Sequence, residues 1–179
     1  MKNSKYVFMG TAAAALIMVA GQAKAEWPEK AIEFVIPFGA GGGADIEGRL
    51  IAKAMSKELG QPVVPVNKPG GGGAITYTYV KNSKPDGYTI AWNSTSILTT
   101  TNIGNVPFKY QALDHIGQVA QQPVPFVVSK SARWNTLKEF MDECKAKPNT
   151  LKVAFAGFGS ATHLAGVAMT QLSGCKPIM

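Results

Sequence analysis

The stretch IEFVIPFGAGGGAD, residues 32–45, decides the fold of this chain. Residues 32–36 form an apolar run closed by Pro37, which predicts a short buried strand. Glycines follow, and from Ile46 to Leu59 apolar residues recur every three or four positions, as in an amphipathic helix that ends at Gly60. A strand that passes through a glycine turn directly into a helix is typical of α/β folds.

Two further strands are predicted beyond this unit. Residues 63–66 are rich in valine, and residues 88–92 form another apolar run after a Pro-Asp-Gly turn. Between them, the glycines at 70–73 lead into a short helix that ends at about Lys81. Strands that alternate with helices through short connections predict a parallel sheet covered by helices.

The second half of the chain is expected to begin a similar unit. Its expected segments are an irregular stretch at 95–109, an extended stretch at 116–128, a helix from 137 to about 147, a strand at 153–156 and a helix from about 161 to 172. The helix at 137 opens with a capping box from Thr136 to Glu139. We therefore expect a first α/β lobe at residues 26–120 and the start of a second lobe at residues 121–179.

The first 25 residues have the pattern of an export signal. Lys2 and Lys5 precede an apolar stretch from Tyr6 to Ala20, which is short for a membrane span. Ala23-Lys24-Ala25 then matches a signal-peptidase site. We expect cleavage before Glu26 and a periplasmic mature protein; the alternative is a retained N-terminal anchor helix.

Composition disfavours two broad classes of protein. The 179 residues carry a formal net charge of +7, which is compatible with a nucleic-acid partner. Arg49 and Arg133 are the only arginines, however, and the chain has no basic run, so no nucleic acid is expected as a partner. A hydrophobic content of 46% is ordinary for a globular protein and disfavours a disordered chain.

The cysteines and histidines are few. Cys144 and Cys175 are the only cysteines, and an oxidising compartment permits a disulfide between them. Two buried, unpaired thiols fit the sequence equally well, because it does not give their separation. With only His115 and His163 in addition, no metal site is suggested.

Two glycine-rich loops each follow a predicted strand and open a predicted helix. We call them the first loop (residues 38–45) and the second loop (residues 157–160). Each leaves backbone N–H groups free at the positive end of a helix dipole, where a carboxylate or phosphate binds well. The alternative is that the glycines only permit tight turns. Asp45 either faces a ligand or complements the helix dipole.

Two enzyme classes fit parts of the same loops. The first loop matches the dinucleotide fingerprint loosely, as Gly39-x-Gly41-x-x-Ala44, but Asn67 and Lys68 stand where an acidic residue is expected. Ser160 and His163, with an aspartate, are the residue types of a hydrolase triad. Their context is not a Gly-x-Ser-x-Gly elbow, and a helix N-cap followed by a first-turn residue explains them better.

Five motifs occur in order along residues 26–179. They are Trp27-Pro28-x-Lys30-x-Ile32, Val35-Ile36-Pro37-Phe38 with Gly41-Gly42-x-x-Asp45, Val66-Asn67-Lys68-Pro69-Gly70, Pro85-Asp86-Gly87-Tyr88-Thr89 and Gly157-x-Gly159-Ser160-x-x-His163-Leu164. This set resembles the Bug family, the periplasmic solute receptors of tripartite tricarboxylate transporters. The resemblance covers nearly all of residues 26–179.

The resemblance implies a two-lobed α/β receptor of the periplasmic-binding-protein type, with parallel-rich sheets and an incomplete second lobe in this chain. The lobes would close like a flytrap on a small carboxylate and deliver it, without enzymatic change or a cofactor, to the membrane subunits of the transporter. A carboxylate sensor for a signalling partner is the main alternative, and an exported hydrolase is a weaker one. By matching motif, the ligand positions are Phe38, Gly39, Gly41, Gly42, Gly43, Asp45, Asn93, Ser94, Gly159, Ser160 and His163.

Overall fold

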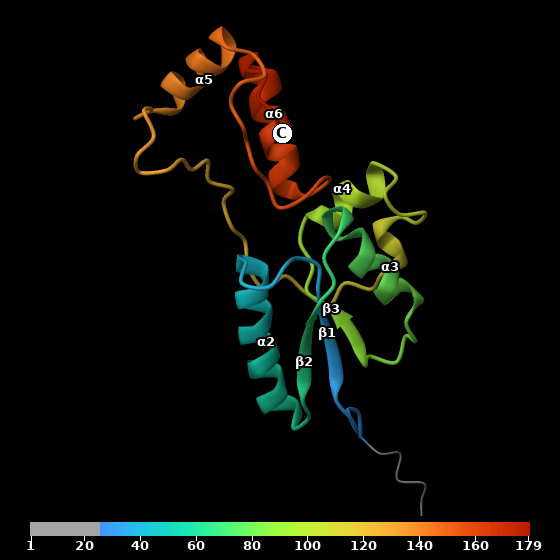
Figure 1. Ribbon diagram of the computed structural model, residues 1–179. Helices are drawn as coiled ribbons and strands as arrows, with labels where there is room; N and C mark the ends of the chain where they lie inside the picture. Colours follow the sequence, from blue (N-terminus) through green and yellow to red (C-terminus); the bar gives the residue numbers. More distant parts are fainter. Residues whose placement is uncertain (1–25) are drawn as a thin grey trace, which may run out of the picture.

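The structure is a computed structural model that describes residues 26–179 (Figure 1). The predicted signal segment lies outside the described residues. A three-stranded parallel sheet in the order β2-β1-β3 forms the centre of the first half. Its strands are β1 (Ile32–Ile36), β2 (Val63–Asn67) and β3 (Thr89–Ala91). The predicted parallel α/β sheet is therefore confirmed, with strand bounds that shift by one residue at most.

Helices cover both faces of this sheet: α2 (Gly43–Leu59) lies on one side and α3 (Ala74–Asn82) on the other (Figure 1). Phe34 of β1 belongs to the buried cluster that packs against α2. Gly48 lets α2 approach β1, because a β-carbon there would lie 2.9 Å from Ile36 Cδ1. On the opposite face, Glu33 accepts a 2.7 Å hydrogen bond from the Tyr79 hydroxyl of α3. Alternate side chains of one strand thus point to opposite helices.

Helix α4 (Ser96–Asn102) corrects the expectation that residues 95–109 are irregular. The segment is rich in serine and threonine, whose intrinsic helix propensities are low. Ile97 and Thr100 are buried, and the hydroxyl of Thr101 donates to the carbonyl of Ile97. Tertiary packing of a buried face therefore overrides weak local propensity. Two short 3-10 turns, η1 (Gly71–Gly73) and η2 (Tyr110–Ala112), flank this region in sequence.

The second half contains α5 (Leu137–Ala146) and α6 (Ala161–Ser173), close to their predicted bounds. Thr136 caps α5 by accepting from the Glu139 N–H at 3.2 Å. The Glu139 carboxylate accepts in turn from the Asn135 N–H, one residue earlier than an ideal capping box. Residues 116–128 have no helix or strand, as predicted. The lobe boundary at 120/121 stays a prediction.

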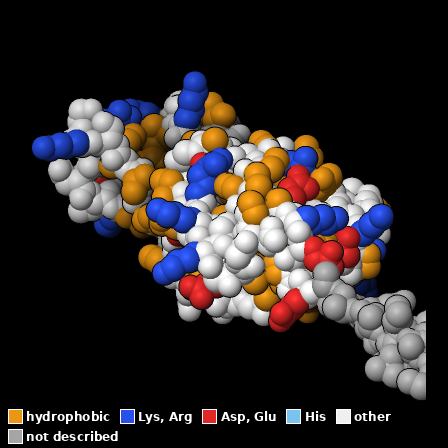
Figure 2. All heavy atoms as spheres, turned by 90° about the horizontal axis from the view of Figure 1, so that it is seen from below, with side chains coloured by type: hydrophobic (Ala, Val, Ile, Leu, Met, Phe, Trp, Pro, Cys, Tyr) orange, Lys and Arg blue, Asp and Glu red, His pale blue; other side chains and the backbone are white. Residues whose placement is uncertain are grey.

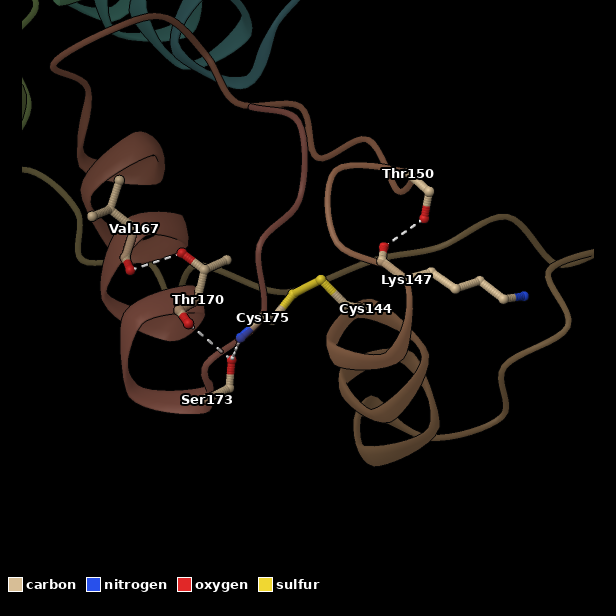
Figure 3. Close-up of a disulfide and its surroundings, with 7 residues drawn as sticks. All are labelled: Cys144, Lys147, Thr150, Val167, Thr170, Ser173 and Cys175. Atoms are coloured by element: carbon tan, nitrogen blue, oxygen red, sulfur yellow. Dashed lines mark hydrogen bonds between the residues drawn. A yellow bond between two sulfur atoms is a disulfide. The ribbon is translucent and has the colours of Figure 1, made fainter.

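A disulfide joins Cys144, near the end of α5, to Cys175, just beyond α6 (Figure 3). Both residues are buried in a small apolar cluster with Phe140 and Met141. Ser173 supports the turn, since its hydroxyl accepts from the Cys175 N–H at 3.3 Å. The bridge therefore ties the two helices of the second half together.

The predicted strand at 153–156 is wrong. Residue pairing is limited to an isolated parallel bridge between Lys152 and Ile178, with the Val153 N–H donating to the Ile178 carbonyl at 2.9 Å. The Ala156 N–H donates instead to the Thr162 hydroxyl. A strand needs a continued ladder of backbone partners, and the N–H of Ala156 goes to a side chain. None of the helices described in residues 26–179 combines the length and apolar character needed to span a bilayer.

Candidate functional site: two glycine loops at helix N-termini

Buried Asp45, in the first turn of α2, fixes the first loop through hydrogen bonds to its carboxylate. Its Oδ2 accepts from the Gly41 N–H at 2.8 Å. Its Oδ1 accepts from Arg49 Nε and from Asn67 Nδ2, both at 2.9 Å. Because the carboxylate faces three protein donors, it shapes the loop in this structure. A direct contact between Asp45 and a ligand stays a prediction.

These donors also set the ionisation of Asp45. The hydrogen bond from Arg49, followed by those from the Gly41 N–H and Asn67, holds the pKa of the Asp45 carboxyl well below its usual range. The folded pKa lies below the unfolded one, so the ionised carboxylate stabilises the fold above the unfolded pKa. That contribution is lost as the pH falls toward the folded pKa, and the loop is fully supported at neutral pH.

Arg49 and Asn67 hold the first loop through hydrogen bonds that the sequence analysis did not predict. Arg49 Nη2 donates to Asn67 Oδ1 at 2.8 Å, and Asn67 Nδ2 donates to the Phe38 carbonyl at 2.9 Å. Together they close a ring of hydrogen bonds around the two ends of the first loop. The available signals were the i, i+4 spacing of Asp45 and Arg49 and the place of Asn67 at the end of a predicted strand.

The first loop presents backbone donors to open space. Gly42 is the N-cap of α2 and supplies no side-chain cap. Within residues 26–179, the N–H groups of Gly43 and Ala44 have no hydrogen-bond acceptor. A β-carbon at Gly39, Gly41 or Gly43 would meet nothing within 4 Å. Two free donors at the positive end of a 17-residue helix form a cradle suited to an anion.

The second loop forms hydrogen bonds with the first turn of α6. Ser160 is 1% exposed, and its hydroxyl caps α6 by accepting from the His163 N–H at 3.2 Å. The Gly159 N–H donates to His163 Nδ1, also at 3.2 Å. The His163 ring packs between Phe155 and Phe158, with ring centroids 4.5 and 4.8 Å away. The Gly159 and Ser160 N–H groups are therefore both used, by His163 and by the Gly157 carbonyl.

The second loop also packs against α4 and η1 of the first half. The Ala161 N–H donates to Ser96 Oγ at 3.2 Å, and the Thr99 hydroxyl donates to the Gly159 carbonyl. The backbone of Gly72 lies so close that a β-carbon there would collide with the second loop. The structure thus brings Gly159 and the first residue of α6 into contact with α4.

Asn93 and Ser94 follow β3 at the carboxyl edge of the sheet. The Ser94 N–H donates to Asn93 Oδ1 at 2.7 Å, and Ser94 Oγ accepts from the Ser96 N–H at 3.2 Å. Buried Tyr77 lies close by, and burial raises the pKa of its phenol to about 12, with Ser94 acting in the opposite direction. Among the described residues the Tyr77 hydroxyl makes no hydrogen bond of acceptable geometry.

Two hollows in the described part of the chain lie away from the predicted ligand positions. One open hollow of about 440 Å³ is lined by Ala74, Ile75, Thr78, Tyr79 and Asn105. Another of about 410 Å³ is lined by Thr95, Leu98, Thr99, Ala161, Leu164, Ala165 and Ala168. Neither of these two, both in the described part of the chain, includes a predicted position. A common cleft formed by the two loops stays a prediction.

Comparison with known proteins decides the family. A family model described as tripartite tricarboxylate transporter family receptor matches residues 48–178. The chain belongs to this receptor family. A UPF0065 protein of Bordetella pertussis is 33% identical over 153 residues, covering 84% of this chain and 47% of that protein. The chain spans about half the length of the curated relatives it matches.

Solved structures agree with this assignment. A structure described as a periplasmic transporter has a TM-score of 0.71 and 30% identity, over 85% of this chain and 52% of that one. MatC (Rpa3494) from Rhodopseudomonas palustris with bound malate has a TM-score of 0.68 and 26% identity, over 85% and 53%. Rpa4515 from R. palustris with adipate has a TM-score of 0.67 and 25% identity, over 86% and 52%. The α/β fold is therefore that of known receptors of this family.

The Ser160 hydroxyl caps α6, and the described residues show no hydrogen bond from it to the His163 imidazole, which a serine hydrolase would use. The described residues contain no group of three or more potential metal ligands. On the face seen in Figure 2, basic, acidic and apolar side chains are interspersed, and no basic stripe runs across it.

Proposed function

We propose that this chain belongs to an exported receptor that binds a small carboxylate and delivers it to the membrane subunits of a tripartite transporter. The observation that carries the proposal is the first loop, with the free N–H groups of Gly43 and Ala44 at the positive end of α2. The family match supports the receptor class. The malate and adipate bound to its structural relatives support the carboxylate class.

The chemistry of the first loop fits a carboxylate better than a neutral ligand. A helix N-terminus stabilises a negative charge by about 0.3–1 kcal/mol, and charge-assisted hydrogen bonds add about 1.5–3 kcal/mol each. Three or four such bonds, after the cost of ordering and closure, reach the roughly −8 kcal/mol of a micromolar complex. The free N–H groups of Gly43 and Ala44 would supply two of these bonds, and the others would come from outside the first loop.

A single backbone N–H gives the sharpest test. Gly43 is the first residue of α2, where proline is well tolerated, and the extended Gly42 before it (φ −78°, ψ 169°) is compatible with a following proline. Gly43→Pro therefore removes one free donor while keeping the helix. Gly43→Ala is the matched control, because it keeps the N–H and its β-carbon meets nothing within 4 Å.

Titration calorimetry of the full chain against mono-, di- and tricarboxylates and aromatic acids, including malate and adipate, measures the outcome. Gly43→Pro is expected to weaken binding of the preferred carboxylate by about 1.5–3 kcal/mol, and Gly43→Ala by much less. Equal affinity in the two variants would remove the first loop from the site. If the wild-type chain binds no member of the panel, or converts any member into a product, the proposed function is wrong.

A further inference from the structure

Charge is divided unevenly between the two halves of the chain. Residues 26–120 carry eight Lys and Arg against eight Asp and Glu, and are neutral overall. Residues 121–179 carry seven Lys and Arg against three Asp and Glu. The net charge of +4 of residues 26–179 therefore lies wholly in the second half. A charge gathered on one part of a protein attracts a partner of the opposite sign.

Three of the seven basic side chains are neutralised by ion pairs with acidic residues of α5. The pairs are Arg133–Glu143, Lys147–Glu143 and Lys138–Asp142. Of the other four, Lys145, Lys152 and Lys176 are exposed and form no ion pair within residues 26–179. We call these three residues the lysine patch, because the fold brings them to one part of the surface.

The disulfide brings two of these lysines together. Lys145 directly follows Cys144 in the chain, and Lys176 directly follows Cys175. The Cα atoms of the two cysteines lie 5.2 Å apart, although 31 positions separate them in sequence (Figure 3). Because both cysteines are buried and both lysines are exposed, the bridge holds two positive charges at one place on the surface.

Backbone pairing beside the disulfide adds Lys152. The Ile178 N–H donates to the Leu151 carbonyl at 2.8 Å, and the Val153 N–H donates to the Ile178 carbonyl at 2.9 Å. Leu151 and Val153 pack on the apolar cluster around the disulfide, so Lys152 between them points to the opposite face. Lys152 is paired with Ile178, and Lys176 stands two positions before Ile178. Paired residues share a face, as do residues two apart, so both lysines lie on the face away from the cluster.

The composition of the lysine patch favours a lipid surface over a protein. Arginine is enriched and lysine depleted in interfaces between proteins, because the planar guanidinium fits carboxylates in a fixed geometry. The patch contains only lysines, which carry compact, hydrated charges on flexible stems. Such charges are attracted to an anionic lipid surface without a shaped pocket, and each adds to the attraction.

We propose that the lysine patch holds the exported receptor against the anionic lipid surface of the membrane that contains its transporter subunits. This weak attachment confines the search for those subunits to the plane of the membrane. The inference rests on the proposed function for export and for the purpose of the attachment. It goes beyond that function, because binding to vesicles is measured without a carboxylate and without a transporter.

Co-sedimentation of the exported chain with lipid vesicles measures the attachment. The chain is purified from the periplasm, because the apolar stretch from Tyr6 to Ala20 of an unprocessed chain would itself favour lipid. The exported chain should bind vesicles of phosphatidylcholine with phosphatidylglycerol more tightly than vesicles of phosphatidylcholine alone, and high salt should release it. Equal binding to the two kinds of vesicle, or no binding to either at low salt, would overturn the proposal.

Two double variants test where the charge must lie. Lys152→Gln with Lys176→Gln should weaken binding to the anionic vesicles about 25-fold, which is about fivefold for each lysine. Lys53→Gln with Lys57→Gln is the matched control, because it removes the same charge from exposed positions of α2, and should weaken binding much less. Lys152→Arg with Lys176→Arg should bind like the wild-type chain, since only the charge is needed. Equal losses in the two glutamine variants, both folded, would overturn the proposal.

A soluble polymer of glutamate separates an acidic protein from a lipid surface. Binding of the wild-type chain to this polymer as tightly as to the anionic vesicles would overturn the lipid assignment in favour of an acidic protein partner. The panel of carboxylates tests the proposed function separately. A chain that binds malate or adipate and ignores the vesicles leaves the proposed function standing and overturns the inference drawn from the lysine patch.

Discussion

The first and second loops share a sequence pattern and differ in what surrounds them. Both follow an extended segment, contain several glycines and open a helix. In the first, the buried Asp45 carboxylate accepts the Gly41 N–H, and within residues 26–179 the N–H groups of Gly43 and Ala44 have no acceptor. In the second, Ser160 caps α6, the Gly159 N–H donates to His163, and the neighbouring Ala161 N–H donates to Ser96 of α4.

A helix N-terminus can bind an anion only when its backbone N–H groups have no other hydrogen-bond acceptor. Ser160 and Ser96 claim two of the donors at the start of α6. Asp45 claims the Gly41 N–H within the first loop, but not the donors of Gly43 and Ala44. The availability of each loop is therefore set by neighbouring side chains, and changing those neighbours should change it.

The largest expected effect comes from the disulfide that joins the end of α5 to the chain just beyond α6. The Cys144–Cys175 disulfide closes a sequence separation of 31 residues, and its loss should cost about 3–4 kcal/mol of unfolding free energy. Cys144→Ser with Cys175→Ser, followed by hydrogen exchange, should raise exchange in α5 and α6 and leave α2 unchanged. Equal loosening of α2 would show that the two halves do not differ in this way.

Gly72→Ala should separate the second loop from η1. The substitution places a β-carbon against the second loop at a left-handed φ of +66°, and should cost about 1–3 kcal/mol. Gly39→Ala in the first loop is the contrasting control, since its β-carbon meets nothing within 4 Å and its φ is not left-handed. Denaturant unfolding measures both. Similar losses of unfolding free energy in the two variants would show that the two loops do not differ in this way.

Ser160→Ala should cost about 1 kcal/mol of stability, because it removes the side-chain cap of α6. Thr136→Ala, which removes the equivalent cap of α5, provides a matched standard of similar size. Thermal and denaturant unfolding of the two variants give the costs. A loss of carboxylate affinity in Ser160→Ala without a loss of stability would instead assign the hydroxyl to the guest.

Gly42→Ser should have the smallest effect on stability, a gain of a few tenths of a kcal/mol, because it adds the cap that α2 lacks. A β-carbon at this position lies at an ordinary 3.5 Å from the Gly39 carbonyl oxygen. The new hydroxyl should also claim a free N–H of the first loop and lower carboxylate affinity. Melting temperature and calorimetry together test whether the first loop has become like the second.

Local patterns predicted most of the elements correctly. The apolar run at 32–36 and the three-to-four spacing up to Leu59 encode β1 and α2, because burial of one face drives both. The pattern was misleading where local propensity and packing disagree. Polar residues 96–102 form a helix around buried Ile97 and Thr100, and the apolar residues at 153–156 lack the backbone ladder of a strand.

The candidate site was likewise predicted only in part from the sequence. Sequence located both loops and the N-cap role of Ser160, which depend on neighbours in the chain. It did not find Arg49 and Asn67 as braces of the first loop, nor Ser96 as the cover of α6, because these contacts join residues 18 to 65 positions apart or depend on how a helix face is turned.

The sequence by itself determined the parallel α/β fold, the family and the two glycine loops, since each rests on short-range patterns of burial and turn chemistry. Only the tertiary structure decided that Cys144 pairs with Cys175, that the Gly43 and Ala44 N–H groups are free at the start of α2, and that Ser96 accepts the Ala161 N–H at the start of α6. The physical reason is that hydrogen bonds and disulfides form between groups a few ångströms apart in space. Those distances are set by how the helices pack on one another and on the sheet.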